Sequence, residues 1–301
     1  TKDMLVQVSQ DPMTGHSYQW QNAAKMRVWG IEFSLNSTNI QSDKFRWDTN
    51  INFSWTDNEI TGYNVTNSST ISALNAIGII KGERTNSYFT YVVDGIDPST
   101  GAYKYKDLDE DGSITVKDKA ILGSPDPRII VGLSNTFRYG NWFLDIFFNS
   151  NFGNKLYNYT RMNFLLPNSS ETSNYLVGAK NYWTSSNPTS MIAANRSNGN
   201  GNALYNSLWI EDAWFIRLQN VRLAYNLSKI PFIHKVFTNA SIYFQAQNLF
   251  CITPYDGLDP ELTNNAYMSA SENLPAFLPG SIDQNSYYPA RTFTFGLNLH
   301  F

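Results

Sequence analysis

The chain has 301 residues and a formal net charge of −3, with 15% aromatic but only 16% charged residues. Soluble proteins typically carry about 25% charged residues, so the polarity here rests on Asn, Ser and Thr instead. The aromatic content argues against a disordered chain, and the negative charge without a basic cluster argues against nucleic-acid binding. No segment reaches the ~18 apolar residues of a transmembrane helix, and the one cysteine, Cys251, excludes an internal disulfide framework.

Alternation of apolar and polar residues with a period of two dominates the sequence. It is clearest over residues 45–55, where such a long alternation strongly predicts a β-strand with two unlike faces. One face carries Phe45, Trp47, Thr49, Ile51, Phe53 and Trp55, and the other carries Arg46, Asp48, Asn50, Asn52 and Ser54.

The same pattern recurs along the chain and predicts about ten strands. In chain order they lie near 4–10, 31–35, 45–55, 86–94, 102–106, 128–138, 142–151, 214–228, 237–249 and 293–301. Only 173–183, inside a long loop, suggests a helix. The fold class is therefore all-β.

The alternation alone fits a soluble sandwich with one face in its core as well as a membrane barrel. Connection lengths favour the barrel, because outer-membrane barrels have short periplasmic turns and long external loops. With the C-terminus placed in the periplasm, the connections 41–43, 94–101, 138–141 and 229–236 fall inside, and 58–85, 107–127, 152–213 and 250–289 fall outside. The sequence thus predicts a transmembrane antiparallel β-barrel whose polar face, including Arg46, Asp48, Asn50 and Asn52, lines the lumen.

The last residues carry a second indication of the membrane. After Thr294 and Gly296, apolar residues alternate up to a terminal Phe301. This ending resembles the assembly signal of bacterial outer-membrane barrels. An edge strand of a soluble protein that ends with Phe would show the same residue pattern.

An acidic loop over residues 107–118 matches the spacing of a calcium-binding loop. Carboxylates occupy positions 1, 3 and 5, and Gly112 at position 6 permits the sharp turn. Hard oxygen ligands would select Ca²⁺ or Mg²⁺, and Asp118 replaces the usual Glu at position 12. The predicted ligands are Asp107, Asp109, Asp111, Ser113, Thr115 and Asp118. A solvated Asp/Gly turn is the plain alternative, and the role expected of a bound ion is to stiffen the loop.

Catalytic motifs are not found in the sequence. There is no G-x-x-x-x-G-K-[ST], G-x-S-x-G or H-E-x-x-H pattern. The adjacent Glu211 and Asp212 would point to opposite faces of a strand, which argues against a glycosidase pair. Aromatic residues in the long loops could instead stack on ligand rings or simply pack the loops: Tyr175, Tyr182, Trp183, Tyr255, Tyr267, Tyr287 and Tyr288.

Several segments together resemble the SusC/RagA-type TonB-dependent outer-membrane transporters of Bacteroidetes. They span essentially the whole chain at the spacing of that family, and each alone is weak. The segments are 1–5, 22–32, 93–101, 107–118, 122–127 (Leu-Gly-Ser-Pro-Asp-Pro), 215–221 (Phe-Ile-Arg-Leu-Gln-Asn-Val), 247–249 (Gln-Asn-Leu) and 288–292 (Tyr-Pro-Ala-Arg-Thr). Ala24 stands where the family often has Gly.

The resemblance implies a barrel of about 22 strands, of which residues 1–301 would be a C-terminal portion without the plug domain and the N-terminal strands. It also implies the partners: the rest of the transporter, a SusD-like surface lipoprotein, the TonB complex acting through the plug, outer-membrane lipid, and glycan or peptide cargo. The expected activity is nutrient import, with no enzymatic reaction.

Three other readings stay open at the level of the sequence. One is a secreted calcium-binding β-sandwich that binds glycans through its loop aromatics. Another is a small outer-membrane enzyme, which the missing nucleophile motif disfavours. The third is a complete barrel of about ten strands, since open sheet edges would leave unpaired backbone groups in the lipid.

Overall fold

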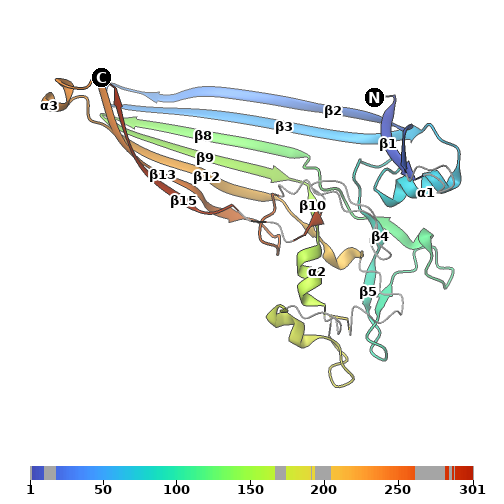
Figure 1. Ribbon diagram of the computed structural model, residues 1–301. Helices are drawn as coiled ribbons and strands as arrows, with labels where there is room; N and C mark the ends of the chain where they lie inside the picture. The colour runs from blue at the N-terminus through green and yellow to red at the C-terminus, as the bar shows by residue number, and fades with distance from the viewer. Residues whose placement is uncertain are drawn as a thin grey trace.

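The fold is described from a computed structural model, which covers residues 2–9, 18–166, 174–190, 192–193, 205–261, 282–284, 287 and 289–300. A single eight-stranded antiparallel sheet dominates it (Figure 1). We call this sheet the wall. Its strands, in spatial order, are β1 (Met4–Ser9), β2 (Tyr18–Gln41), β3 (Phe45–Tyr63), β8 (Ile129–Tyr139), β9 (Trp142–Phe152), β12 (Phe215–Asn226), β13 (Asn239–Ile252) and β15 (Thr292–His300).

The wall is open. Each strand pairs with its neighbours in the order of the chain, and β1 and β15 at the two edges are not paired with each other. The longest strand, β2, has 24 residues, which at ~3.4 Å per residue is about 80 Å. This is far more than the ~9–11 residues that a tilted strand needs to cross a bilayer, so β2 and β3 extend beyond any membrane-spanning zone.

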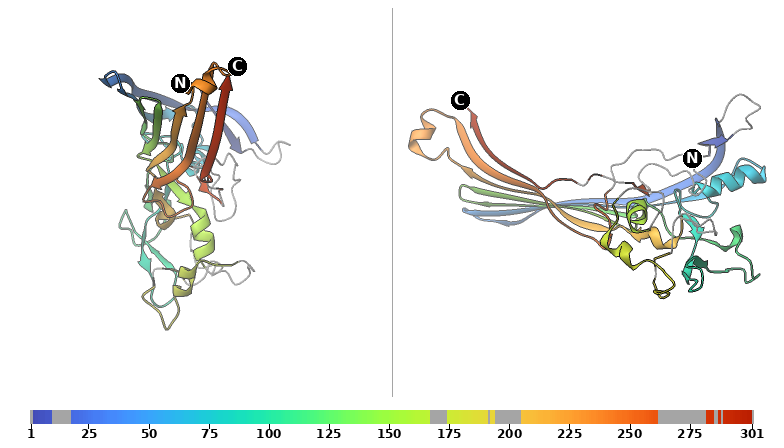
Figure 2. Two further views of the ribbon diagram at one scale, coloured as in Figure 1. Left: turned by 90° about the vertical axis from the view of Figure 1, so that its left-hand side faces the viewer. Right: turned by 60° about the horizontal axis from the view of Figure 1, so that its bottom comes forward.

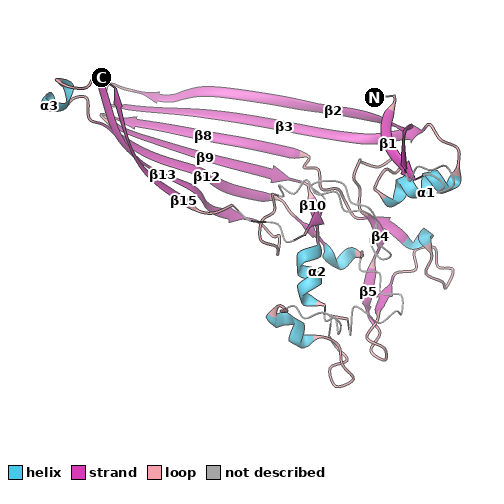
Figure 3. Cartoon of the chain, in the orientation of Figure 1, coloured by secondary structure: helices cyan, strands magenta, loops and turns pink. Residues whose placement is uncertain are grey.

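Short and long connections segregate to the two ends of the wall (Figures 1 and 3). The short ones are 42–44, 140–141 and 227–238, and the last contains the helical turn α3 (Pro231–His234). In the tightest, Gly140 takes a left-handed φ of 59° between the paired residues Tyr139 and Trp142. The long connections, 64–128, 153–214 and 253–291, gather at the opposite end, and we call their described residues the loop body.

The loop body contains the remaining elements. Its helices are α1 (Ser68–Ala76), η2 (Val116–Asp118), α2 (Tyr159–Leu165), η3 (Val177–Asn181) and η4 (Ser207–Trp209). Its small sheets pair β4 (Phe89–Tyr91) with β7 (Lys119–Ile121), β5 (Val93–Ile96) with β6 (Tyr103–Tyr105), and β10 (Lys155–Asn158) with both β11 (Ile210–Asp212) and β14 (Ile282–Asp283). Among the described residues, no helix is long and apolar enough to cross a membrane.

Two predicted wall strands lie elsewhere. Segments 86–94 and 102–106 form the short strands β4, β5 and β6 of the loop body, so the wall has eight strands where the alternation predicts about ten. The predicted inside turn 94–101 is wrong for the same reason, because it closes the β5–β6 hairpin within one long connection. The physical cause is burial: Tyr88 and Tyr103 pack in a protein core and do not face outward.

The apolar face of the wall is continuous and bare. Register places Trp55, Phe53 and Ile51 of β3 beside apolar residues of β2 and β8. The series continues across β9, β12, β13 and β15. Ile31 is 64% exposed and Phe295 is 74% exposed. Within the described residues, no second sheet covers this face, and the predicted alternative of a β-sandwich is therefore wrong.

The protein cores all lie at the loop end. The largest cluster of buried residues joins the three long connections through Tyr88, Tyr157, Met162, Trp209 and Ile282. A second cluster packs α1 against the loop ends of β1, β2 and β3, and a third surrounds Tyr255. The predicted helix at 173–183 is only the 3₁₀ segment η3, and residue 173 lies outside the described residues.

On the polar face, Tyr243 and Gly296 form a close cross-strand contact. The two residues are register partners, and a Cβ atom on Gly296 would lie 2.3 Å from the Tyr243 ring. The guanidinium of Arg222 stacks over the same ring, 4.7 Å from its centroid. The last strand therefore needs glycine here so that the ring can lie flat against β15.

We predict that Gly296→Val hinders docking of β15 because the new side chain overlaps the Tyr243 ring, an overpacking cost of about 1–3 kcal/mol. The full-length protein should reach the outer membrane in a folded, heat-modifiable form at several-fold lower yield on gels. Tyr243→Ser should restore the yield of the valine variant. Gly62→Val in β3, where a Cβ meets no atom within 4 Å, is the control and should assemble normally. Normal assembly of Gly296→Val would contradict the prediction.

Candidate functional site on the polar face of the wall and in the loop body

The polar residues predicted from β3 lie on one face, as expected. Arg46 Nε is 2.7 Å from Asp48 Oδ2, and the Thr38 hydroxyl of β2 donates to Asp48 Oδ1 at 2.7 Å. Asn52 donates to Asn50 at 2.8 Å, and Ser34 of β2 donates to Asn52 at 2.8 Å. These side chains satisfy one another along the strands and leave a hydrated, nearly neutral surface. Such a surface suits a water-filled lumen.

Three of the family-like segments meet at one irregularity in the wall. The register between β12 and β13 shifts between Leu218 and Asn220, and Asn248 on β13 has a left-handed φ of 54°. The side-chain amide of Asn248 donates to the carbonyl of Ala290 at 3.2 Å. Residues 215–221, 247–249 and 289–292 are thus brought together at a β-bulge. Bulges of this kind re-aim side chains at specific positions of a barrel.

A buried arginine holds the third long connection against the same strands. The Arg217 side chain is 4% exposed, its Nη2 lies 2.7 Å from Asp259 Oδ1, and its guanidinium stacks over Phe215 at 5.2 Å. Glu261 Oε2 is 3.7 Å from the same nitrogen, and burial raises the pKa of Glu261. The sequence does not predict this ion pair, because Arg217 and Asp259 are 42 residues apart in the chain.

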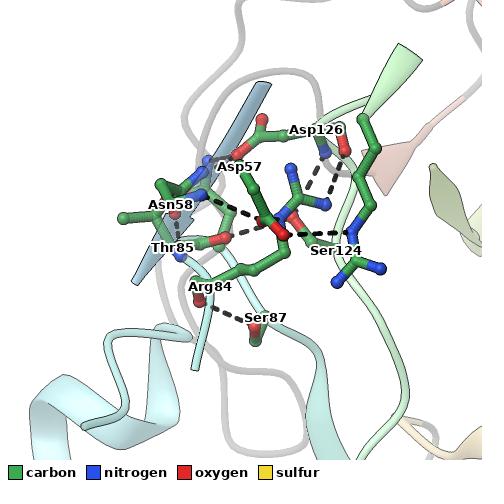
Figure 4. A network of polar contacts seen from close by, with 9 residues as sticks. Asp57, Asn58, Arg84, Thr85, Ser87, Ser124 and Asp126 are labelled. Atoms are coloured by element: carbon green, nitrogen blue, oxygen red, sulfur yellow. Dashed lines mark hydrogen bonds and ion pairs between the residues drawn. The ribbon is translucent and has the colours of Figure 1, made fainter. Parts of the chain in front are cut away.

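A network of charged residues fastens the first long connection to the ends of β3 and β8 (Figure 4). Arg84 Nε lies 2.8 Å from Asp57 Oδ1, and Arg128 Nε lies 3.8 Å from the other Asp57 oxygen. Asp126 accepts from the side chain of Asn86 at 3.1 Å. Burial lowers the pKa of Arg84 and raises the pKa of Asp126. Every charge in this network has a partner, so its role is to position the loop.

The long connections are also joined to one another. β10 of the second connection pairs in parallel with β14 of the third, and the Thr90 hydroxyl of the first bonds the Tyr205 carbonyl of the second. Glu211 is held by Arg161 at 2.7 Å, and Asp212 by Lys155 at 2.8 Å. The two adjacent carboxylates are therefore neutralised by different cations, which agrees with their expected separation on β11.

The predicted ligand-stacking aromatics divide into two groups. Tyr255 is only 5% exposed and donates to Asp283 Oδ2 at 2.7 Å, so it packs the loop body and does not face a ligand. Burial raises its pKa above the ordinary tyrosine value. Tyr175 and Tyr182 stay exposed beside η3, whereas Tyr267 and Tyr288 lie outside the described residues.

The acidic loop brings together part of its predicted ligand set. One carboxylate oxygen from each of Asp107, Asp109 and Asp118 lies within 4.8 Å of the others. Asp111 is not in this group; its Oδ1 accepts from the backbone N–H of Ser113 at 2.9 Å. Thr115 Oγ1 caps η2 by accepting from the backbone N–H of Lys117 at 3.3 Å.

Backbone donors keep the buried carboxylate of this loop ionised. The N–H groups of Thr115 and Leu108 donate to the two oxygens of Asp118 at 2.6 and 2.7 Å, and these bonds lower its pKa. Lys117 Nζ lies 3.3 Å from Asp109 and already offsets part of the negative charge. The donor set is hard oxygen and fits Ca²⁺ or Mg²⁺. Metal binding by these residues stays a prediction.

Comparisons with known proteins match the chain along its whole length. It is 31% and 28% identical to two TonB-dependent receptors of Formosa agariphila, and 28% identical to the TonB-dependent receptor SusC of Bacteroides thetaiotaomicron. Each match includes 100% of this chain but only 29–32% of the relative, so the chain spans about a third of their length. No family model matches it.

Solved structures show the same fold. The RagAB peptide transporter superposes with a TM-score of 0.77 at 23% identity, over 99% of this chain and 32% of that one. The RagAB peptide importer in its closed-closed state gives 0.76 at 25% identity, over the same shares. These likenesses confirm the antiparallel barrel fold predicted from the alternation, and they confirm the resemblance that the sequence motifs carry.

We predict that two adjacent residues of β3 report different surroundings, because successive side chains point to opposite faces. In full-length protein with Cys251→Ser and any other cysteine replaced, Asn50→Cys should react with a charged maleimide in outer-membrane vesicles. Ile51→Cys should react several-fold more slowly with that reagent but readily with a lipid-soluble one. Equal labelling of both positions by the charged reagent would contradict a bilayer on the apolar face.

Proposed function

Because this chain resembles the SusC/RagA-type TonB-dependent transporters along its entire length, we propose that it forms the C-terminal portion of such a transporter's barrel wall and takes part in active import of nutrients across the outer membrane. The observation that carries this proposal is the bare apolar face of the wall. Seven neighbouring strands present that face, and none of the described residues forms a layer over it, which suits hydrocarbon as the surrounding medium.

The open edges require the rest of the barrel. In a bilayer, unpaired backbone groups cost several kcal/mol each, so β1 and β15 need strands beside them. Eight wall strands in about a third of the relatives' length agree with a barrel of about 22 strands. We propose that the remaining strands and a plug domain come from the other two thirds of such a polypeptide.

The segregation of connections supports an orientation. Short turns face the periplasm and long loops face outward in outer-membrane barrels. On that basis the C-terminus and α3 are periplasmic, and the loop body is on the cell surface. A SusD-like lipoprotein would cover the loop body, and the TonB complex would act through the plug.

The cargo is an oligosaccharide or a peptide. A RagAB neighbour described as a peptide transporter supports the second class, and the likeness to SusC leaves the first open.

Uptake by whole cells tests the import function. Cells that express the full-length protein should accumulate labelled oligosaccharides or labelled oligopeptides. Accumulation should fall at least tenfold when the gene is deleted or when a protonophore collapses the inner-membrane gradient. Accumulation that persists in de-energised cells would contradict active import, and cleavage of the label without accumulation would favour the outer-membrane enzyme.

A second proposal concerns the acidic loop. We propose that Asp107, Asp109 and Asp118 bind Ca²⁺, or Mg²⁺ more weakly, with Asp111, Ser113 and Thr115 closing around the ion through side-chain or backbone oxygens. The convergence of three carboxylate oxygens within 4.8 Å supports this. The ion would stiffen the loop between β6 and β7 and would have no part in a reaction.

For the acidic loop, we expect Asp107→Asn with Asp109→Asn to remove calcium-dependent protection of residues 107–118 from proteolysis in the full-length protein. Chelation by EGTA should speed cleavage of this loop at least fivefold in the parent and leave the double variant unchanged. Glu110→Gln is the matched control, because Glu110 lies in the same loop but outside the carboxylate group. Identical cleavage of the parent with and without calcium would exclude the ion.

A further inference from the structure

The β12–β13 turn, residues 227–238, differs from the other two short turns of the wall. It has twelve residues, against three in 42–44 and two in 140–141, and it contains a turn of helix, α3. Figure 1 shows α3 projecting past the ends of the wall strands, at the end away from the loop body, and the right-hand view in Figure 2 agrees.

Backbone hydrogen bonds build this turn into a defined element. The Ile233 and His234 N–H groups donate to the Ile230 carbonyl at 3.0 Å, and Phe237 donates to Ile233 at 2.9 Å. At its base, Leu227 donates to Ala240 at 2.8 Å, and the Ser228 hydroxyl bonds Asn239 at 3.0 Å. These bonds define the backbone from which the side chains of the turn project.

Large apolar side chains on the turn are left in the open. Phe232 is 79% exposed, Val236 is 55% exposed and Ile230 is 40% exposed. An apolar cluster at the tip of a surface turn marks a contact with something outside the described protein.

The charges on the turn have a single sign. Lys229, Lys235 and His234 are exposed, and residues 227–238 include no Asp or Glu. Within the described part of the chain, no ion pair involves Lys229 or Lys235. Basic residues interleaved with exposed Phe, Ile and Val are the composition of an element that lies in a membrane interface. The free ammonium groups complement anionic headgroups.

The turn is continuous with the apolar face of the wall. Two residues before it, Tyr225 packs edge-on against Trp142 with ring centroids 4.8 Å apart, and Tyr139 beside them is exposed. Aromatic residues at a strand end are typical of the membrane interface. Next to this pair is a hollow of about 300 Å³ lined mainly by Trp142, Leu223, Tyr225, Ile242, Phe244 and Phe295.

We propose that the β12–β13 turn is a membrane anchor that binds an anionic phospholipid of the leaflet on the short-turn side. Lys229 and Lys235 hold the headgroup phosphate, Phe232 and Val236 enter the acyl boundary, and an acyl chain fills the hollow beside Trp142 and Tyr225. This inference rests on the proposed placement of the wall in the outer membrane. It adds a lipid contact that fixes the height of β12 and β13 in the bilayer.

A fluorescence experiment tests the anchor. Full-length protein carrying Cys251→Ser, with any other cysteine replaced, receives an environment-sensitive label at His234→Cys and is reconstituted in phosphatidylcholine vesicles. Quenching is measured with a trace of spin-labelled phosphatidylglycerol or spin-labelled phosphatidylcholine. Two lysines should give about a 25-fold preference for the anionic lipid, seen as the ratio of lipid concentrations that give equal quenching.

Matched variants separate the contributions. Lys229→Gln with Lys235→Gln should remove the preference while the label stays near the bilayer, and Phe232→Ser should weaken quenching by both lipids. A label at Ser42→Cys in the 42–44 turn, where Asp43 offsets Lys44, should show no preference. Equal quenching of the position-234 label by the two lipids in the parent protein overturns the proposal. Protection from both lipids and from aqueous iodide also overturns it, because protein would then cover the turn.

A label at Ile51→Cys distinguishes failure of this inference from failure of the proposed function. If acyl-chain spin labels quench position 51 but lipid never reaches position 234, the wall is in the bilayer and only the anchor is wrong. If position 51 is also beyond their reach, the membrane placement itself fails, and the anchor fails with it.

Discussion

The structure depends on which medium touches the apolar face of the wall. That face runs across seven strands, and side chains such as Ile31 and Phe295 are more than half exposed on it. Patches of this extent are unfavourable in water, and hydrocarbon removes that penalty. Hydrocarbon in turn forbids unpaired backbone groups, so the open edges at β1 and β15 demand further strands. In the outer membrane that we propose, one surrounding medium would therefore explain the bare face and would require further strands at the open edges.

Two kinds of stabilisation are separated along the molecule. The wall has extensive cross-strand pairing but no core of its own among the described residues, whereas all three buried clusters lie at the loop end. The loop body is held as a water-exposed protein would be, by burial of Tyr88 and Tyr157 and by paired charges such as Arg84 and Asp57. Joined in this way, the long connections present a common surface at the loop end of the wall.

In the orientation that we propose, the opposite end of the wall lies at the membrane interface. Tyr139, Trp142 and Tyr225 form an aromatic group at the strand ends, and the β12–β13 turn continues it with basic and apolar residues. Between these ends, the polar face carries hydroxyls and amides that satisfy one another. The contact of Tyr243 with Gly296 then fits the last strand to its neighbour. Each zone of the wall thus matches the chemistry of what lies beside it.

The sequence by itself determined the two faces of the wall, because successive side chains of a strand alternate whatever the strand packs against. It also located six of the eight wall strands closely, together with a short inner segment of β2 and the first eleven residues of β3. Only the tertiary structure decided that 86–94 and 102–106 leave the wall, since apolar alternation looks the same whether a strand faces lipid or a loop core. Contacts such as Arg217 with Asp259, or Asn248 with Ala290, join residues about 42 positions apart. The local sequence pattern does not predict such pairs, because they form only when the long connections fold back onto the strands.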